Sequence, residues 1–130
     1  MDNLLGFFAQ SVGKIETEKF QLSSRFKVGN DILNWEIGCI TAMENNSIRK
    51  QCLDYSGRFD GSKYQSLLLS RCIIFPDLNN MALQNSYNVK SSEELIAVML
   101  SPGEFEFLCD KVLKINGFKS EEELVNTVKN

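Results

Sequence analysis

The residues best suited to covalent or metal chemistry are four cysteines, at positions 39, 52, 72 and 109. No two of them have the C-x-x-C spacing of a zinc or redox site, and the chain contains no histidine. Mixed cysteine and histidine zinc sites, and Ser-His or Cys-His nucleophiles, all require a histidine. A four-thiolate site would have to be assembled from scattered positions. We therefore interpret the cysteines as reduced, mostly buried thiols and expect no metal.

Carboxylates and a loop that contains two glycines are the remaining candidates for chemistry. Glu93 and Glu94 stand where a helix is expected to begin, and acidic side chains there normally cap the helix and interact favourably with its dipole. Residues 57–63 differ from a phosphate-binding loop, because three residues separate the glycines and Ser62 precedes Lys63. We interpret this segment as a turn between two helices. The sequence predicts no enzyme activity and no cofactor.

The composition indicates one domain that spans residues 1–130. Apolar residues make up 43% and charged residues 24% of the chain, which is typical of a globular protein. The net charge is −3, and no basic run is longer than Arg49-Lys50, which argues against nucleic-acid binding. Apolar runs are far shorter than the ~20 residues of a membrane-spanning helix. The N-terminus has Asp2 where a signal peptide has basic residues, so we expect a protein that stays in the cytoplasm.

The elements that must position any site begin with two stretches of alternating apolar and polar residues, at 19–27 and 33–39. Such a period of two is typical of strands with one apolar face. Between them, residues 28–31 contain Gly29, Asn30 and Asp31, which tolerate the backbone angles of a tight turn. The pattern predicts a β-hairpin. A hairpin is only marginally stable by itself, so its Trp35 face should pack on the helices that follow.

Helix start signals dominate the rest of the chain. Ser or Thr followed three residues later by Glu, the capping box, begins at Thr41, Ser91, Ser101 and Ser120. Further helices are expected over 64–72 and from a cap at Asp77, although 72–75 fits a strand equally well. The segment at 101 is the best defined, and its residues Phe105, Leu108, Val112 and Ile115 share one face before a C-cap at Gly117. The fold class is α+β, with an N-terminal β-hairpin packed on a bundle of about six short helices.

The order of several short motifs matches a known family. They are Trp35-Glu36-Ile37, residues 48–52 (IRKQC), 75–78 (FPDL), 83–87 (LQ-x-SY), 101–105 (SPGEF) and 115–118 (INGF). From about residue 25 to residue 118 the chain resembles the XkdN-like tail assembly chaperones of tailed phages and defective PBSX-type prophages. The resemblance implies a protein without enzymatic activity that acts in the bacterial host. It would keep the long tape measure protein soluble, help the tail tube assemble around it, and be absent from the mature virion.

The resemblance also directs attention to the N-terminal segment that precedes the match. Leu4, Leu5, Phe7 and Phe8 suggest a short amphipathic helix, and we take these four residues as candidate contacts for the tape measure protein. The alternative is that they pack on the domain's own helices. Chaperones of this class often occur in two lengths through a translational frameshift, and codons for Lys129-Asn130 could form the slippery run.

Two other functions and the oligomeric state stay open at this point. A structural subunit of the tail tube or baseplate would be found in many copies in purified particles, and a small regulatory adaptor would have no phage genes beside it. An exposed helix face serves a second copy of the chain as well as a different partner, so homo-oligomerisation is not decided.

Overall fold

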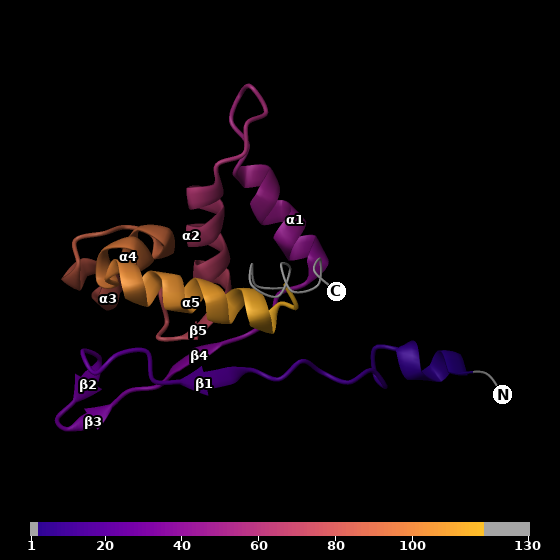
Figure 1. Ribbon diagram of the computed structural model, residues 1–130, viewed down its shortest axis with the longest axis horizontal. Helices are drawn as coiled ribbons and strands as arrows, with labels where there is room; N and C mark the ends of the chain where they lie inside the picture. Colours follow the sequence, from indigo (N-terminus) through magenta and orange to yellow (C-terminus); the bar gives the residue numbers. More distant parts are fainter. Residues whose placement is uncertain (1–2, 119–130) are drawn as a thin grey trace, which may run out of the picture.

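The computed structural model describes residues 3–118 and has an α+β fold. Its elements in chain order are a 3₁₀-helix η1 (Asn3–Phe7), strands β1 (Glu18–Phe20), β2 (Lys27–Val28), β3 (Asp31–Ile32) and β4 (Trp35–Ile37), helices α1 (Ala42–Gln51) and α2 (Gly61–Cys72), strand β5 (Ile73–Phe75), and helices α3 (Met81–Ser86), α4 (Ser92–Met99) and α5 (Pro102–Ile115). Figure 1 shows the α-helices on one side of the sheet, with η1 held away from them.

The predicted hairpin is present but interrupted. β1 pairs antiparallel with β4, with Phe20 opposite Trp35, and β2 pairs with β3 around Gly29, whose φ is +63°. The residues between these two ladders are not in strands, so the expected continuous strands over 19–27 and 33–39 were wrong in extent. Trp35 is buried in the same core cluster as the helix residues Leu69 and Leu108, and its ring also meets that of Phe26 edge-on at a centroid distance of 5.2 Å.

A third strand completes the sheet. Residues 73–75, which fitted a helix or a strand equally well, form β5 and pair antiparallel with β4. The strand order is therefore β1-β4-β5, and β4 lies in the centre with Trp35 and Ile37 buried. The long-range pairing decides this segment, because each ladder hydrogen bond needs a partner strand that is distant in sequence.

The helices begin largely where the capping signals stand. Thr41 and Ser101 form complete capping boxes with Glu44 and Glu104. The Ser91 hydroxyl accepts a hydrogen bond from the backbone N–H of Glu94 in the first turn of α4. The expected cap at Asp77 was wrong, since α3 starts after Asn80, whose side chain accepts from the backbone N–H of Leu83. Five α-helices lie within residues 3–118, and the expected helix after Ser120 falls outside the described residues.

The core lies between the sheet and the helices. Its fully buried members include Trp35, Ile37, Ile48, Leu69, Leu95, Ile96, Leu108 and Val112. Three consecutive leucines of α2, Leu67 to Leu69, are all buried because this helix packs against α1, α4 and α5. Within the described range, the molecule has no helix long and apolar enough to cross a membrane.

The predicted C-cap of α5 is confirmed. Gly117 has a φ of +84°, and the backbone N–H groups of Gly117 and Phe118 donate to the carbonyls of Lys114 and Leu113. This pair of bonds is the Schellman motif, which satisfies carbonyls that have no partner inside the helix. The apolar face of α5 that ends there buries Leu108 and Val112 completely.

Candidate interaction surfaces

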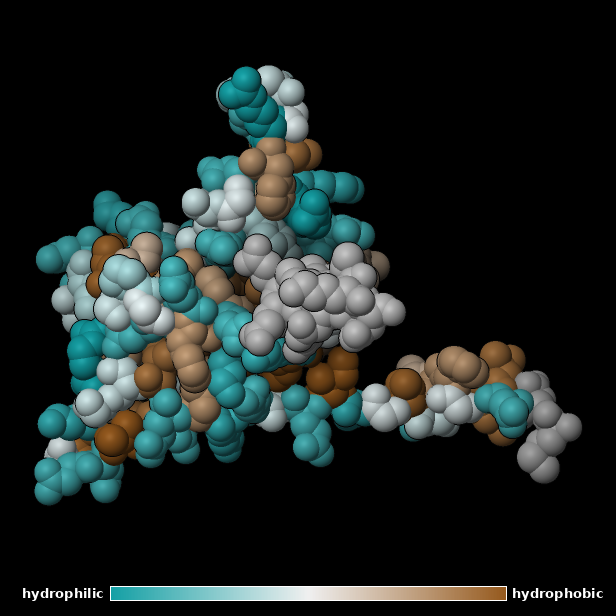
Figure 2. Space-filling model, in the orientation of Figure 1, coloured by the Kyte–Doolittle hydropathy of each residue, from teal (hydrophilic) through white to brown (hydrophobic). Residues whose placement is uncertain are grey.

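The N-terminal arm, residues 3–17, is the most exposed apolar part of the described chain. Leu5 is 64% and Phe7 80% exposed, and Val12 and Ile15 are more than half exposed. Figure 1 shows η1 at the far end of the arm, beyond the C-terminal end of α5, and Figure 2 shows apolar residues along it. Isolated exposed apolar residues are normal, whereas a continuous series of them marks an interaction site.

The local sequence explains why the arm has this form. Residues 3–13 contain no charged side chain, and η1 is followed by a turn in which the Phe8 carbonyl accepts from the backbone N–H groups of Ser11 and Val12. Extended chain then leads to the sheet, where the Thr17 hydroxyl donates to the Glu36 carboxylate at 2.7 Å. One short 3₁₀ turn replaces the expected amphipathic α-helix, because Gly6 disfavours a longer helix.

The four candidate residues Leu4, Leu5, Phe7 and Phe8 are thus brought together at the tip of the arm. None of them is buried, and Phe8, the least exposed, still presents 40% of its surface. The core described above is complete without them. Within residues 3–118, packing on the domain's own helices, the alternative left open by the sequence, is not the arrangement in the structure.

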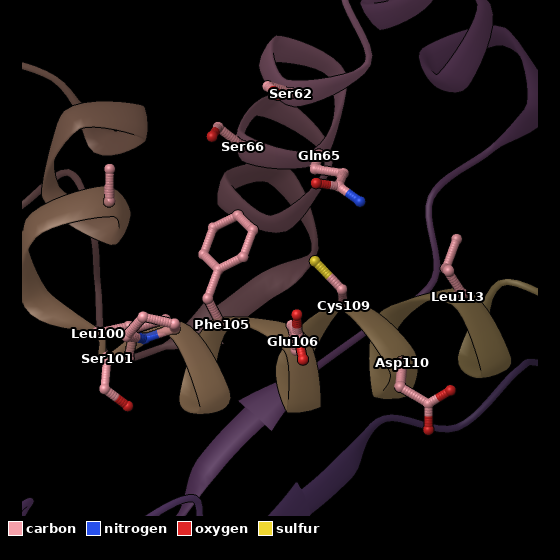
Figure 3. A pocket seen from close by; sticks show the side chains of 12 residues that line it. Ser62, Gln65, Ser66, Leu100, Ser101, Phe105, Glu106, Cys109, Asp110 and Leu113 are labelled. Atoms are coloured by element: carbon pink, nitrogen blue, oxygen red, sulfur yellow. The ribbon is translucent and has the colours of Figure 1, made fainter.

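A groove lies between α2, α4 and α5 and was not indicated by the sequence. Its volume is about 780 Å³, and it is lined by Ser62, Gln65, Ser66, Ala97, Leu100, Ser101, Pro102, Phe105, Glu106, Cys109, Asp110 and Leu113. In Figure 3 the Phe105 ring and the Cys109 thiol point from α5 into the groove, and Ser62, Gln65 and Ser66 of α2 form the facing wall. The lining thus combines apolar side chains from α5 with polar side chains from α2.

A smaller cavity of about 240 Å³ continues from the groove between α2 and α5. It shares Gln65, Cys109 and Leu113 with the groove, and adds the apolar side chains of Leu68 and Val112. A groove in which apolar side chains such as Phe105 and Leu113 alternate with polar ones such as Gln65 and Glu106 suits one amphipathic face of a partner helix.

The Cys109 thiol in the groove and the Cys72 thiol in α2 are not activated for chemistry. Burial, reinforced by the charge of Glu106, raises the pKa of the Cys109 thiol to about 11, and burial also raises that of Cys72 to about 11. Both thiols are protonated at neutral pH and are poor nucleophiles. All four cysteines are free, and the described residues contain no cluster of three or more His, Cys, Asp or Glu side chains that could hold a metal ion.

The Glu104 carboxylate has a structural role at the end of the groove. It accepts from the Ser101 backbone N–H at 2.8 Å and from the Arg25 Nε at 2.9 Å. The hydrogen bond from Arg25 lowers the pKa of Glu104 to about 2. Arg25 also donates to the Met99 carbonyl at 2.9 Å, so this side chain joins the hairpin region to the α4–α5 corner.

The sequence could not have identified the groove, because its residues come from three segments between positions 62 and 113. The periodicity of α5 marks the face that enters the core, and it does not show which neighbouring residues are left uncovered. The arm gave a local signal, since four large apolar residues stand together within positions 4–8. In the structure this segment forms only a short 3₁₀ turn.

Comparison with known proteins adds a family and a fold. A model of the phage XkdN-like tail assembly chaperone protein family matches residues 4–129. The crystal structure of the protein YqbN superposes with a TM-score of 0.82 at 19% sequence identity, over 92% of this chain and 99% of that one. At this identity the likeness shows the fold alone. No curated protein sequence matches the chain.

Proposed function

The chain belongs to the phage XkdN-like tail assembly chaperone family, and from this premise we propose that it binds the tape measure protein of the same phage and keeps it soluble during tail assembly. The proposal extends to a non-enzymatic protein that acts in the cytoplasm of the bacterial host and is absent from the mature virion.

The observation that carries the proposal is the exposed apolar tip of the arm. Phe7, at 80% exposure, and its neighbours would contribute little to the stability of the free domain, yet they are suited to covering an apolar stretch of another protein. A phenylalanine buries on the order of 150–250 Å² when its ring is fully covered. The tip therefore offers a compact apolar surface that is not buried in the fold of the domain itself.

The groove supplies a second contact region in the proposed complex. Long tail proteins of helical character expose apolar stripes before assembly, and a helix recognises a groove by such a stripe with residues at i, i+3, i+4 and i+7. The groove, at about 780 Å³, has room for several of these side chains, and Phe105 and Leu113 lie along its length. The protonated Cys109 thiol within it favours apolar packing over reaction.

Co-expression with the tape measure protein tests this function. We expect the tagged tape measure protein to retain the chain in a pull-down and to be soluble only in its presence. Covering one phenylalanine contributes roughly 1.5–3 kcal/mol, so a double substitution of Phe7→Ser and Phe8→Ser should weaken binding by at least about 100-fold. Ala97→Glu, which places a charge in the groove at an exposed helical position, should also weaken it.

The matched control is Met43→Ser. Met43 is 81% exposed, as Phe7 is, but it lies in the first turn of α1 and not in the arm or groove. Its substitution should leave retention and solubility unchanged. If the wild-type chain neither binds the tape measure protein nor improves its solubility, the proposal is wrong. Many copies of the chain in purified tails, detected by mass spectrometry, would then favour a structural subunit.

A further inference from the structure

A finger, residues 53–60, projects between α1 and α2 on the opposite side of the molecule from the sheet (Figure 1). Its two sides are joined by a β-bridge between Leu53 and Phe59, and the Asp60 backbone N–H donates to the Cys52 carbonyl at 2.7 Å. The turn expected from the sequence over 57–63 therefore begins earlier, at Leu53, and its two sides are joined by a β-bridge. The finger therefore has backbone hydrogen bonds of its own and is more than a connection between two helices.

The tip of the finger is held by one carboxylate. Asp54 Oδ1 accepts from the backbone N–H groups of Ser56 at 2.9 Å and Arg58 at 2.8 Å. The Asp54 carbonyl accepts from Gly57, whose φ of +82° closes the turn. The hydrogen bond from Arg58 lowers the pKa of Asp54, so the carboxylate is ionised at neutral pH and keeps this turn closed. Little conformational freedom of the backbone remains to be lost when the finger binds something.

The side chain at the tip of the finger is an aromatic ring that is not part of the hydrophobic core. Tyr55 is fully exposed, and Leu53 and Phe59 below it are 51% and 42% exposed. Tyrosine is enriched among the residues that dominate binding energy at protein interfaces, since it offers a large, rigid, amphipathic surface. A fully exposed tyrosine on a pre-formed turn fits that use.

The surroundings of the finger are basic in an otherwise acidic protein. Residues 49–63 contain four basic and two acidic side chains, a local charge of +2 where the whole chain has −3. The two carboxylates are engaged in backbone hydrogen bonds, Asp54 in the turn and Asp60 at the N-cap of α2. Arg49, Lys50, Arg58 and Lys63 are all exposed and present their charge to solvent.

Arg49 also fixes the finger to the body. Its guanidinium lies 4.8 Å from the centroid of the Phe59 ring and 5.7 Å from that of Tyr64. Beside this stack is a cleft of about 340 Å³ lined by Asn46, Arg49, Lys50, Leu53 and Phe59. The cleft is thus lined by both apolar and basic side chains.

We propose that the finger is a third docking element for the client protein, beside the arm tip and the groove, and recognises a segment that combines Asp or Glu with a large apolar side chain. This inference rests on the proposed function and adds the chemistry of the bound segment. The apolar side chain enters the cleft beside Phe59, Tyr55 covers it, and the carboxylates meet Lys50 and Arg58. Charge complementarity of this kind gives specificity and speeds association. Nucleic acid is disfavoured because these four cations form only a small basic region in a protein whose net charge is −3.

The test compares three variants in the co-expression pull-down with the tagged tape measure protein. Tyr55→Ser alone should lower the retained amount about tenfold, as expected for removal of an interface tyrosine. Lys50→Glu combined with Arg58→Glu should lower it by a similar factor. Raising NaCl from about 0.05 to about 0.5 M should release the wild-type chain and have much less effect on the charge-reversed variant. An array of overlapping peptides from the tape measure protein should show the wild-type chain bound to acidic, apolar segments.

The controls use residues of the same types at a distance from the finger. Tyr87→Ser and Lys90→Glu, which follow α3, should bind as the wild type does. Wild-type retention with finger variants within about twofold of it would overturn the inference and leave the proposed function standing. Failure of the wild type itself to bind overturns both. Preference for basic peptides, or co-purification of nucleic acid that Tyr55→Ser removes, would also overturn the inference.

Discussion

Replacing Glu104 by Gln should destabilise the domain by about 1.5–2 kcal/mol at neutral pH. The hydrogen bond from Arg25 lowers the pKa of Glu104 from 4.5 to about 2, and that fall corresponds to about 3.4 kcal/mol of differential stabilisation of the ionised form. The Glu104 side chain is only 12% exposed, but that of Arg25 is 54% exposed, so solvent screening reduces the contribution to about half. Gln preserves the shape and removes the charge.

The pH dependence gives this prediction its sign. The pKa of Glu104 is lower in the folded than in the unfolded chain, so its contribution is fully present above about pH 4.5 and is lost as the pH falls toward 2. At pH 3 less than half of it should remain. Urea unfolding of wild type and Glu104→Gln at pH 7 and pH 3 measures the difference in free energy of unfolding at each pH.

A double-mutant cycle with Arg25→Gln assigns the effect to the pair. The coupling energy should account for most of the loss, because Arg25 is the largest cause of the lowered pKa. A difference below about 0.5 kcal/mol at pH 7, or one that is equal at both pH values, would refute the reasoning. In that case the capping bond to the Ser101 N–H, which Gln can also accept, would be the main role of this side chain.

Four further predictions concern other parts of the fold. Gly117→Ala should cost about 1 kcal/mol in urea unfolding, because φ at this position is +84° and a Cβ is strained there. Leu108→Ala, at a completely buried position, should cost about 2–5 kcal/mol, again by urea unfolding. In a variant whose other cysteines are serine, Cys109 should react slowly with iodoacetamide at pH 7 and gain reactivity only as the pH approaches its raised pKa of about 11. Asp54→Ala should speed the hydrogen exchange of the two tip amides that its carboxylate binds, with little change in the core.

Local signals predicted the helices well and the strands less well. The boxes at Thr41 and Ser101 formed as expected, because a capping box joins groups only three residues apart and needs nothing else from the fold. The strand lengths were overestimated, since alternation shows only that one face is apolar, whereas a strand ends where its partner ends. The cap at Asn80, in place of Asp77, shows that two nearby cap residues cannot be ranked without the packing of the helix that follows.

The candidate site divides in the same way. The four residues of the arm tip were predicted as contacts from the sequence because they lie within five positions, and the tertiary structure shows them exposed, while their binding role stays a prediction. The groove was invisible, since Gln65, Ala97 and Phe105 become neighbours only when α2, α4 and α5 pack. The finger was identified as a turn, and its role as a presented surface depends on the exposure of Tyr55, which no local pattern encodes.

The sequence by itself determined the family, the α+β class, the main helix boundaries and the lack of a histidine-dependent site. Each of these depends on residue identity or on spacings within one turn of helix. Only the tertiary structure decided that residues 73–75 are a strand, that the arm stays outside the core, and that a groove remains open beside α5. These outcomes depend on which surfaces find a partner elsewhere in the chain, and that competition is settled by long-range packing.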